Sequence, residues 1–268
     1  MVDNKFFVID SHCHIYPEKI ASKAVEHTDN FYGVKSNEKG TVSELLKCND
    51  DCGIDISIVQ SVATTPKQVA SINRFISEEV KKSNGRLVGL GTLHPDSDNI
   101  GEDVKYIKQL GLKGVKLHPD IQGFKIDDYR CLKIYELCEK ENLPILMHTG
   151  DNRYDNSNPN RLLPILEIYT ELTVIGAHFG GYSIWDEASK LLSGHKNLFV
   201  DCSSSFFKLS DKEILTIIRR YGVDRVLFGT DFPMWSPKKE LERFLSLDLN
   251  NKEKEQILSL NAKKVFGI

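Results

Sequence analysis

The chain has 268 residues, of which 40% are hydrophobic and 27% are charged, a composition typical of a globular protein large enough to bury a full core. Its 35 basic and 38 acidic residues give a net charge of −3 and are interspersed, so nothing indicates a surface for nucleic acid. The N-terminal residues lack the features of a signal peptide, and no run of about 18 apolar residues predicts a membrane span.

Short apolar segments rich in β-branched residues predict strands that are buried on both faces. In chain order they lie at 6–10, 56–62, 86–93, 113–118, 144–149, 172–178, 197–202 and 225–230. Apolar residues at helical spacing predict helices between them, at 41–52, 66–83, 101–111, 127–142, 161–171, 184–194 and 211–222.

The order of these segments predicts the fold class. From the second predicted strand onward a new strand begins roughly every 25–32 residues, which is the length of one βα unit. Eight such units favour an α/β fold of the (β/α)8 TIM-barrel type, with an open doubly wound sheet as the alternative. We expect a single domain at 1–268, with an insertion at 15–40 over the barrel mouth and a C-terminal helix at 250–265.

Chemistry-bearing side chains gather where the predicted strands end. Active sites of (β/α)8 barrels lie at the carboxyl ends of the strands. Five of the eight histidines stand at such ends in this chain, and Asp231 follows the last predicted strand. The histidines are His12, His14, His118, His148 and His178.

A subset of these residues predicts a metal site. His12 and His14 are two residues apart, so strand alternation places both on one face. Two imidazoles on one face suit a divalent first-row metal. His148 and Asp231, from other strand ends, would complete a set of three nitrogens and one oxygen and leave a position open for water.

Ordered motifs give a resemblance to a known family. The segments VIDSHCH, GVKLHP, ILMHTG, VIGAHFGG, VLFGTDFP and NAKKVFGI run from residue 8 to residue 268. In this order they resemble the amidohydrolase superfamily, and more closely its branch that includes aminocarboxymuconate-semialdehyde decarboxylase. The resemblance implies that His12, His14 and His148 are metal ligands. It implies that Asp231 binds the metal and exchanges a proton with its water, and that His178 binds a second metal or acts as a proton-transfer and polarising group.

The family resemblance leaves the reaction open. Some decarboxylases of this branch begin the first motif with Glu, whereas this chain keeps His12, which favours hydrolysis. Our main expectation is a metal-dependent hydrolase that cleaves an amide, ester or lactone bond of a small, anionic substrate through metal-activated water. The alternative is a metal-dependent, non-oxidative decarboxylase of a small unsaturated or aromatic acid. A metal-free lactonase ranks third.

Further side chains near the predicted strand ends are candidates for substrate binding. Lys116 and His118 are two residues apart and suit a substrate carboxylate. The resemblance offers Lys116 a second role, because binuclear members of the superfamily carry a bridging carboxylated lysine near this position. Arg153 and Tyr154, in the loop after the fifth predicted strand, and Trp235, after the eighth, complete the set of candidates.

The remaining expectations concern the cofactor and the surroundings of the protein. A histidine-and-carboxylate site suits zinc first, with manganese or iron as alternatives. The six cysteines form no CxxC pair, so we expect buried thiols in a cytoplasmic protein. The expected partner is a small-molecule substrate, with no nucleic acid and no membrane, and the default assembly is a homodimer.

Overall fold

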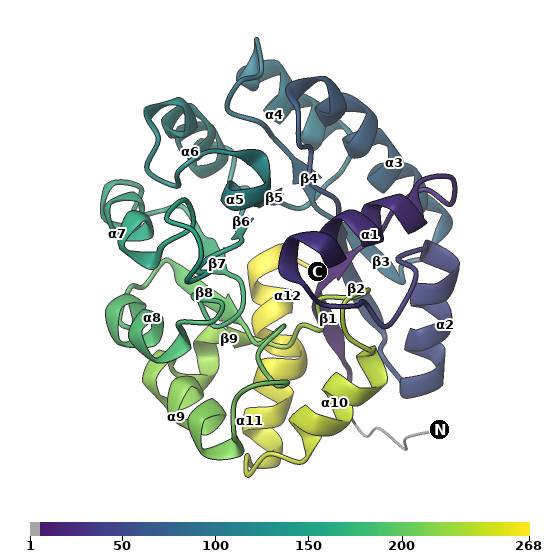
Figure 1. Cartoon of the computed structure of the whole chain (residues 1–268), viewed down its shortest axis with the longest axis vertical. Helices are drawn as coiled ribbons and strands as arrows, with labels where there is room; N and C mark the ends of the chain where they lie inside the picture. Colours follow the sequence, from purple (N-terminus) through teal and green to yellow (C-terminus); the bar gives the residue numbers. More distant parts are fainter. Residues whose placement is uncertain (1–5) are drawn as a thin grey trace.

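A computed structural model of the chain describes residues 6–268. Within this range, parallel strands form the staves of a barrel and helices surround them (Figure 1). The strands are β1 (Ile9–His14), β2 (Ile56–Gln60), β3 (Leu87–Gly89), β4 (Gly91–Thr92), β5 (Val115–Leu117), β6 (Ile145–Met147), β7 (Val174–Gly176), β8 (Leu198–Asp201) and β9 (Val226–Leu227).

From the second onward, each predicted strand segment contains at least one of these strands, and the predicted stave at 86–93 holds both β3 and β4. Leu90 joins the two halves, because its N–H donates to the carbonyl of Val59 at 2.9 Å, while the next N–H, of Gly91, bonds Gly114 at 2.9 Å. The first predicted strand, at 6–10, is displaced, since β1 begins at Ile9 and runs on to His14.

Hydrogen bonds between the first and last staves close the barrel. The N–H of Ser11 donates to the carbonyl of Phe228 at 2.8 Å, and the N–H of Asp231 donates to the carbonyl of His12 at 2.8 Å. The sheet therefore closes on itself, and the predicted α/β barrel is confirmed, in place of the open sheet.

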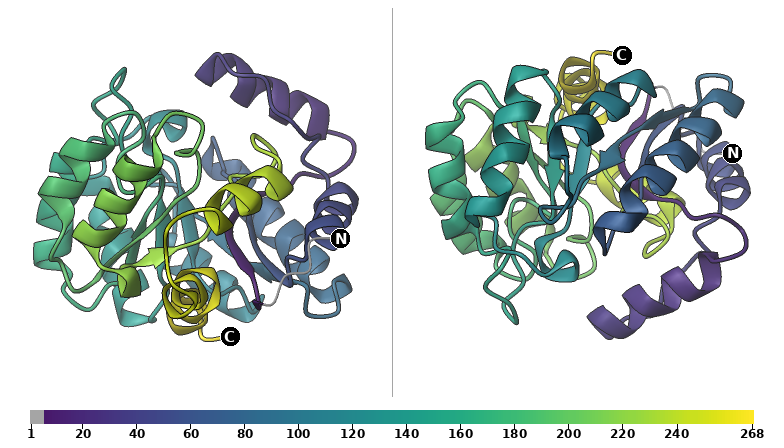
Figure 2. Two further views of the ribbon diagram at one scale, coloured as in Figure 1. Left: turned by 90° about the horizontal axis from the view of Figure 1, so that it is seen from below. Right: turned by 90° about the horizontal axis from the view of Figure 1, so that it is seen from above.

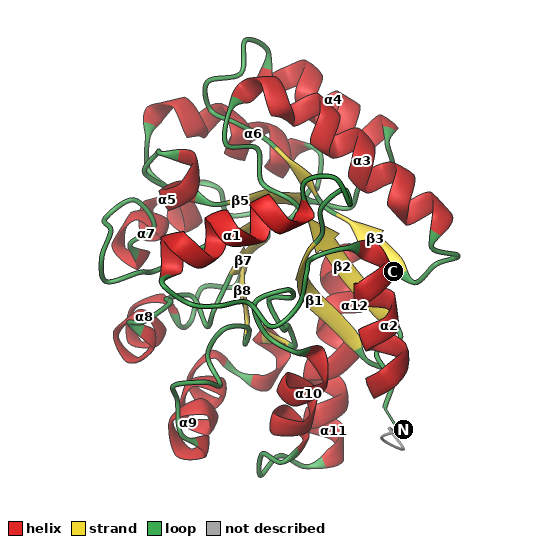
Figure 3. Ribbon diagram, turned by 45° about the vertical axis from the view of Figure 1, so that its right-hand side comes forward, coloured by secondary structure: helices red, strands yellow, loops and turns green. Residues whose placement is uncertain are grey.

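The helices form the outer layer (Figure 3). Their bounds are α1 (Ala21–Tyr32), α2 (Val42–Cys52), α3 (Val69–Lys82), α4 (Ile100–Gln109), α5 (Pro119–Gln122), α6 (Leu132–Lys140), α7 (Pro159–Ile168), α8 (Trp185–Leu192), α9 (Asp211–Tyr221), α10 (Pro237–Leu245), α11 (Asn251–Glu255) and α12 (Asn261–Phe266). Sequence analysis did not predict α1, α5 or α10 as helices, although Ser236 and Pro237 form a helix-start signal for α10.

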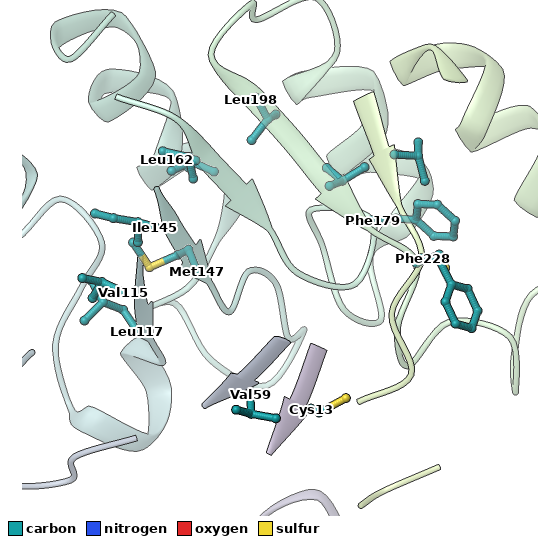
Figure 4. Close-up of a cluster of buried hydrophobic side chains, with 14 of the residues drawn as sticks. Cys13, Val59, Val115, Leu117, Ile145, Met147, Leu162, Phe179, Leu198 and Phe228 are labelled. Carbon is teal, nitrogen blue, oxygen red and sulfur yellow. The ribbon is translucent and has the colours of Figure 1, made fainter. Parts of the chain in front are cut away.

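Two apolar layers hold the barrel together. The outward side chains of the strands pack under the helices, as Val115, Leu117, Ile145 and Met147 do in Figure 4. The inward side chains form a separate cluster into which α12 inserts Ala262 and Phe266. Strand alternation explains the division, since neighbouring residues point to opposite faces of the sheet. The inner cluster comprises chiefly Ile9, Ile58, Leu90, Leu146, Ile175, Phe199 and Leu227.

The two ends of the barrel are covered differently. In Figure 2, α12 lies against the end at which the strands begin, and α1 stands over the opposite end, where they finish. Helix α1 falls inside the segment 15–40 that we predicted as an insertion. The assignment of one domain to 1–268 stays a prediction, and residues 1–5 of it lie outside the described residues. No helix in residues 6–268 is long and apolar enough to cross a membrane.

Candidate metal centre

A cavity of about 540 Å³ opens at the carboxyl ends of the strands, beneath α1. Its lining combines donor side chains from several staves with apolar side chains from α1 and α3. The donor groups include every strand-end histidine named above, together with Lys116 and Asp231: His12, His14, Lys116, His118, His148, His178 and Asp231. Parallel staves bring these residues together because they all end at the same rim.

Three of the predicted ligands point their donor atoms at one another. The Nε2 atoms of His12 and His14 lie 3.2 Å apart, and the Asp231 Oδ1 atom lies 3.4 Å from the first and 3.5 Å from the second. For metal–ligand bonds of about 2.0–2.1 Å, tetrahedral donors stand roughly 3.3–3.4 Å apart. The three donors therefore fit one divalent ion.

Asp201, at the end of β8, fixes the orientation of His12. Its Oδ2 atom lies 2.9 Å from His12 Nδ1, and both side chains are buried. Burial by itself would raise the pKa of Asp201, but the neighbouring His12 holds that pKa well below its usual range. An ionised carboxylate on Nδ1 places the ring hydrogen there and leaves the Nε2 lone pair for a metal.

An irregularity in β1 lets His12 face the interior. The register between β1 and β2 shifts between Asp10 and Cys13, so Ile9 and His12, three residues apart, both point inward. Buried Asp10 accepts hydrogen bonds from the N–H of His12 at 3.1 Å and from the Thr230 hydroxyl at 2.6 Å. Burial raises the pKa of Asp10 to about 6.

Space for the His12 ring comes from the last stave. A Cβ atom added to Gly229 would lie 3.1 Å from the Cβ of His12 and 3.5 Å from that of Asp201. The first distance is closer than ordinary van der Waals contact, so a side chain at this position would push on the His12–Asp201 pair. The glycine therefore belongs to the architecture of the site.

His148 and His178 form a second imidazole pair in the same cavity. The Nδ1 atom of His148 lies 3.1 Å from Nε2 of His178. The donor atoms of His12, His14 and Asp231 lie within 4.8 Å of one another, and His148 is not part of this group. Its role as the fourth ligand stays a prediction.

The protonation state of His178 follows from its surroundings. Burial lowers the pKa of His178 to about 4, so the ring is neutral at pH 7. The Ser203 carbonyl accepts a hydrogen bond from Nδ1 at 3.1 Å, which leaves a lone pair on Nε2. With its hydrogen on Nδ1, neutral His178 accepts a hydrogen bond at Nε2 from the Nδ1–H of His148, which lies 3.1 Å away.

Two of the candidate catalytic residues adopt left-handed backbone conformations. The φ angle is 58° at His178 and 61° at Asp231, a region that residues other than glycine rarely occupy. Such conformations persist only where surrounding contacts hold them, and they concentrate at functional sites. At Asp231 one such contact comes from Ser204, whose hydroxyl donates to Oδ2 at 2.6 Å.

Lys116 supplies a buried positive charge next to the three donors. Its Nζ lies 3.1 Å from His12 Nε2, and the side chain is 1% exposed. Burial lowers the pKa of Lys116 to about 8, although the carboxylates of Asp231 and Asp201 act in the opposite direction. The ammonium form remains the major one at pH 7, so the group can bind an anionic ligand.

Helix α1 contributes a residue that sequence analysis missed. The hydroxyl of Tyr32 lies 2.7 Å from His118 Nε2 and 3.5 Å from His148 Nε2, and the two imidazoles stack with centroids 3.9 Å apart. Asp120 Oδ2 lies 3.7 Å from His148 Nε2. No strand ends at Tyr32, so the rule that located the histidines could not find it.

Three predicted substrate-binding residues do not line the cavity. Arg153 forms a two-pronged ion pair with Asp151, donating from Nε at 2.9 Å and from Nη2 at 2.6 Å. Its Nη1 donates to the carbonyl of Phe31 at 2.8 Å, which ties the end of α1 to the loop after β6. Tyr154 stacks on Phe31, and the Trp235 indole donates to Ser204 Oγ at 2.8 Å.

Asp201 also escaped the sequence analysis. It ends β8, and Asp231 follows the last predicted strand, so a carboxylate at the end of an apolar strand segment is the signal that identifies it. Asp10 and Asp120 carry no such signal, because their contacts with Thr230 and His148 join segments that are distant in the chain.

Comparison with known proteins gives three relationships. A family model described as amidohydrolase matches residues 9–268. The chain is 29% identical over 115 residues to 2-amino-3-carboxymuconate-6-semialdehyde decarboxylase of Dictyostelium discoideum. This match covers 41% of the chain and 32% of that relative, so it spans about a third of the relative's length.

Solved structures share the fold over nearly the whole chain. One is 5-carboxyvanillate decarboxylase from Sphingomonas paucimobilis, with a TM-score of 0.77 and 15% identity over 98% of this chain and 100% of that one. Another is dihydroxybenzoic acid decarboxylase from Polaromonas sp. JS666 with bound manganese and an inhibitor, with a TM-score of 0.74 and 16% identity over 98% and 97%. At these identities the likeness establishes the fold.

Proposed function

Since the chain belongs to the amidohydrolase family whose model spans residues 9–268, we propose that it is a metal-dependent, non-oxidative decarboxylase of a small unsaturated or aromatic acid. The observation that carries the proposal is the convergence of the His12, His14 and Asp231 donor atoms beside the ammonium of Lys116. Hydrolysis was our main expectation from sequence. The named relatives are decarboxylases and support the alternative better.

His12, His14 and Asp231 would hold the divalent ion, with His148 as the fourth ligand. A bound ion supplies positive charge that stabilises substrate oxygens as negative charge develops on them. Zinc is our prediction from the donor types. Manganese is the alternative, which the manganese bound in the Polaromonas structure supports.

The chain's own residues have distinct roles toward an acid that carries a hydroxyl beside its carboxylate. Lys116 binds the carboxylate, because it is the buried cation at the cavity floor. His178, whose Nε2 lies 3.1 Å from Nδ1 of His148, is the candidate polarising group beside the substrate hydroxyl. Asp231 begins the reaction as a carboxylate that can accept a proton, since neighbouring groups, His12 foremost, outweigh the effect of burial and hold its pKa well below its usual range.

The proton for the product therefore comes from the substrate itself. Asp231 takes the hydroxyl proton and delivers it to the carbon that bears the carboxylate. The bond to the carboxyl carbon then breaks, its electron pair returns to the ring or double bond, and carbon dioxide leaves. The product departs as the oxyanion and takes a proton from solvent.

The direct test is product analysis with the chain reconstituted with zinc or with manganese. We expect release of labelled carbon dioxide from 2,4-dihydroxybenzoate or another hydroxy-substituted aromatic acid, and incorporation of labelled bicarbonate in the reverse direction. The His178→Asn variant should lower kcat by about 10²-fold or more.

A pH-stat assay on lactones and esters runs beside it. Base uptake with no carbon dioxide from any acid would restore hydrolysis and overturn the proposal. Ser193→Ala, at the end of α8 and outside the cavity, serves as the control variant. A homodimeric assembly and a cytoplasmic location remain predictions.

A further inference from the structure

The cavity extends well beyond the donor cluster. Its outer part lies between α1 and the first half of α3. There the lining changes from imidazoles and carboxylates to apolar side chains: Ile20, Ala24, Val25, Ile72, Phe75 and Ile121. The outer part is continuous with the metal end, because all of these residues line the same cavity as His12 and Asp231.

The first turns of α1 present apolar side chains to the cavity. Ile20, the residue before the helix, and Ala24 are four residues apart and therefore share one side. Of the twelve residues of α1, Ala21 is the one that is buried, and Ile20 is 50% exposed. Apolar surface left against water in this way gives up stabilisation that burial would provide.

The facing wall has the same character. Ile72 and Phe75 are three residues apart on α3, so they too lie on one side of their helix, and both are half-buried. Two apolar helix faces thus enclose a space that neither of them fills. Lys23 and His27 of α1 also line the cavity, but most of its lining surface is apolar.

We infer that the substrate carries an apolar extension, an alkyl chain or a second ring, which binds between α1 and α3 while its acidic head occupies the metal end. The inference rests on the proposed function for the identity of the head and on the cavity lining for the tail. A volume of about 540 Å³ lies within the range of pockets that hold drug-sized ligands. A single-ring acid leaves the α1–α3 part of this volume empty.

The size of the expected effect follows from apolar burial. Each buried methylene is worth about 0.8 kcal/mol, or about fourfold in affinity. Since a flexible chain also loses conformational freedom on binding, we expect a pentyl group to tighten binding by at least about tenfold.

The experiment compares two pairs of probes on the metal-loaded protein. The first pair is resorcinol and 5-pentylresorcinol, whose dissociation constants are measured by calorimetry; neither has a carboxylate to lose. The second pair is 2,4-dihydroxybenzoate and its 6-pentyl derivative, for which kcat and KM are measured. We expect the pentyl group to lower the dissociation constant within the first pair and KM within the second, each by at least about tenfold.

Two variants test whether the tighter binding of the pentyl compounds arises between α1 and α3. Ala24→Phe fills the space from the α1 side and Phe75→Ala removes the opposite wall, so each should reduce the pentyl advantage to a few-fold or less. Ile168→Ala is the matched control, because Ile168 is an exposed apolar residue on α7 that lies outside the cavity. It should leave the pentyl advantage unchanged.

The outcomes separate the two proposals. Equal affinity for resorcinol and 5-pentylresorcinol overturns the inference, and so does a pentyl advantage that survives in both Ala24→Phe and Phe75→Ala. A pentyl advantage that these variants abolish, with no decarboxylation of either acid, supports the apolar subsite and refutes the proposed reaction instead.

Discussion

The carboxylate of Asp201 lies 2.9 Å from Nδ1 of His12, on the side of the ring opposite the donor atoms of His14 and Asp231. The pair joins β8 to β1, and β9 lies between these two strands in the barrel. This contact determines which nitrogen of His12 is free, and it makes Asp201 the residue on which the first prediction depends.

Asp201→Asn should weaken metal binding without removing a ligand. A neutral amide no longer fixes the tautomer or orientation of His12, and loss of such a partner typically costs 10–100-fold in metal affinity. Competition against a chelator of known affinity measures the effect. Asp224→Asn, at an exposed aspartate on the opposite end of the barrel, is the control, and equal affinities in the two variants would refute the orienting role.

Asp231→Asn should abolish turnover while the barrel stays folded. The substitution removes a ligand oxygen and the proposed proton carrier together, so we expect kcat to fall by about 10³-fold or more. Removal of the metal with a chelator should have the same effect in the unmodified enzyme, and re-addition should reverse it. Circular dichroism monitors the fold. A folded Asp231→Asn enzyme with normal turnover would exclude this mechanism.

Arg153→Gln should loosen α1 and raise KM more than it changes kcat. Arg153 links Asp151 to the carbonyl of Phe31 at the end of the helix, and this link acts beside the contacts of Tyr32 with His118 and of Phe31 with Tyr154. We expect a KM increase of about three- to tenfold, since gating elements act mainly on binding.

Arg130→Gln provides a matched control for that variant. Arg130 pairs with both carboxylate oxygens of Asp128 in the same two-pronged way, two residues apart in sequence, but its Nη1 donates to Asp96 and not to α1. Hydrogen exchange of the α1 amides should quicken in the Arg153 variant and not in the Arg130 variant. Unchanged exchange in both would show that α1 is held by other contacts.

Glu240→Gln should make stability less dependent on pH. Glu240 is buried on α10 with Oε2 unpaired among the described residues. Burial, reinforced by Asp10 and Asp231, raises its pKa from 4.5 to about 8. Between these values the unfolded chain releases a proton that the folded chain retains, so stability falls as pH rises from about 4.5 to 8 and is constant above.

The Glu240→Gln variant has no such pH-dependent loss of stability. Between pH 4.5 and pH 8 its free energy of unfolding should therefore rise progressively relative to that of the parent. The full difference is about 5 kcal/mol, which corresponds to a pKa shift of about 3.5 units at 1.36 kcal/mol each. Urea unfolding at pH 5 and at pH 8 measures the difference. An equal difference between the two proteins at both pH values would show that Glu240 ionises normally in the folded state.

The sequence alone determined the barrel and the principal donors. Apolar segments at regular spacing specify parallel strands that are buried on both faces, as at 113–118 and 144–149, and they do so locally. Since parallel staves share one rim, His12, His14 and Asp231 had to meet once the strands were recognised. The same reasoning brought Lys116 and His178 into the same cavity.

Tertiary structure alone decided what surrounds those donors. Asp201 acts through a residue 189 positions away, and Tyr32 reaches the site from a helix that belongs to no stave. Arg153 looks like an anion binder in sequence, but its charge is committed to Asp151. These facts depend on distances between segments far apart in the chain, which local periodicity does not encode, whereas strand formation and strand-end position depend on neighbouring residues and can be read from them.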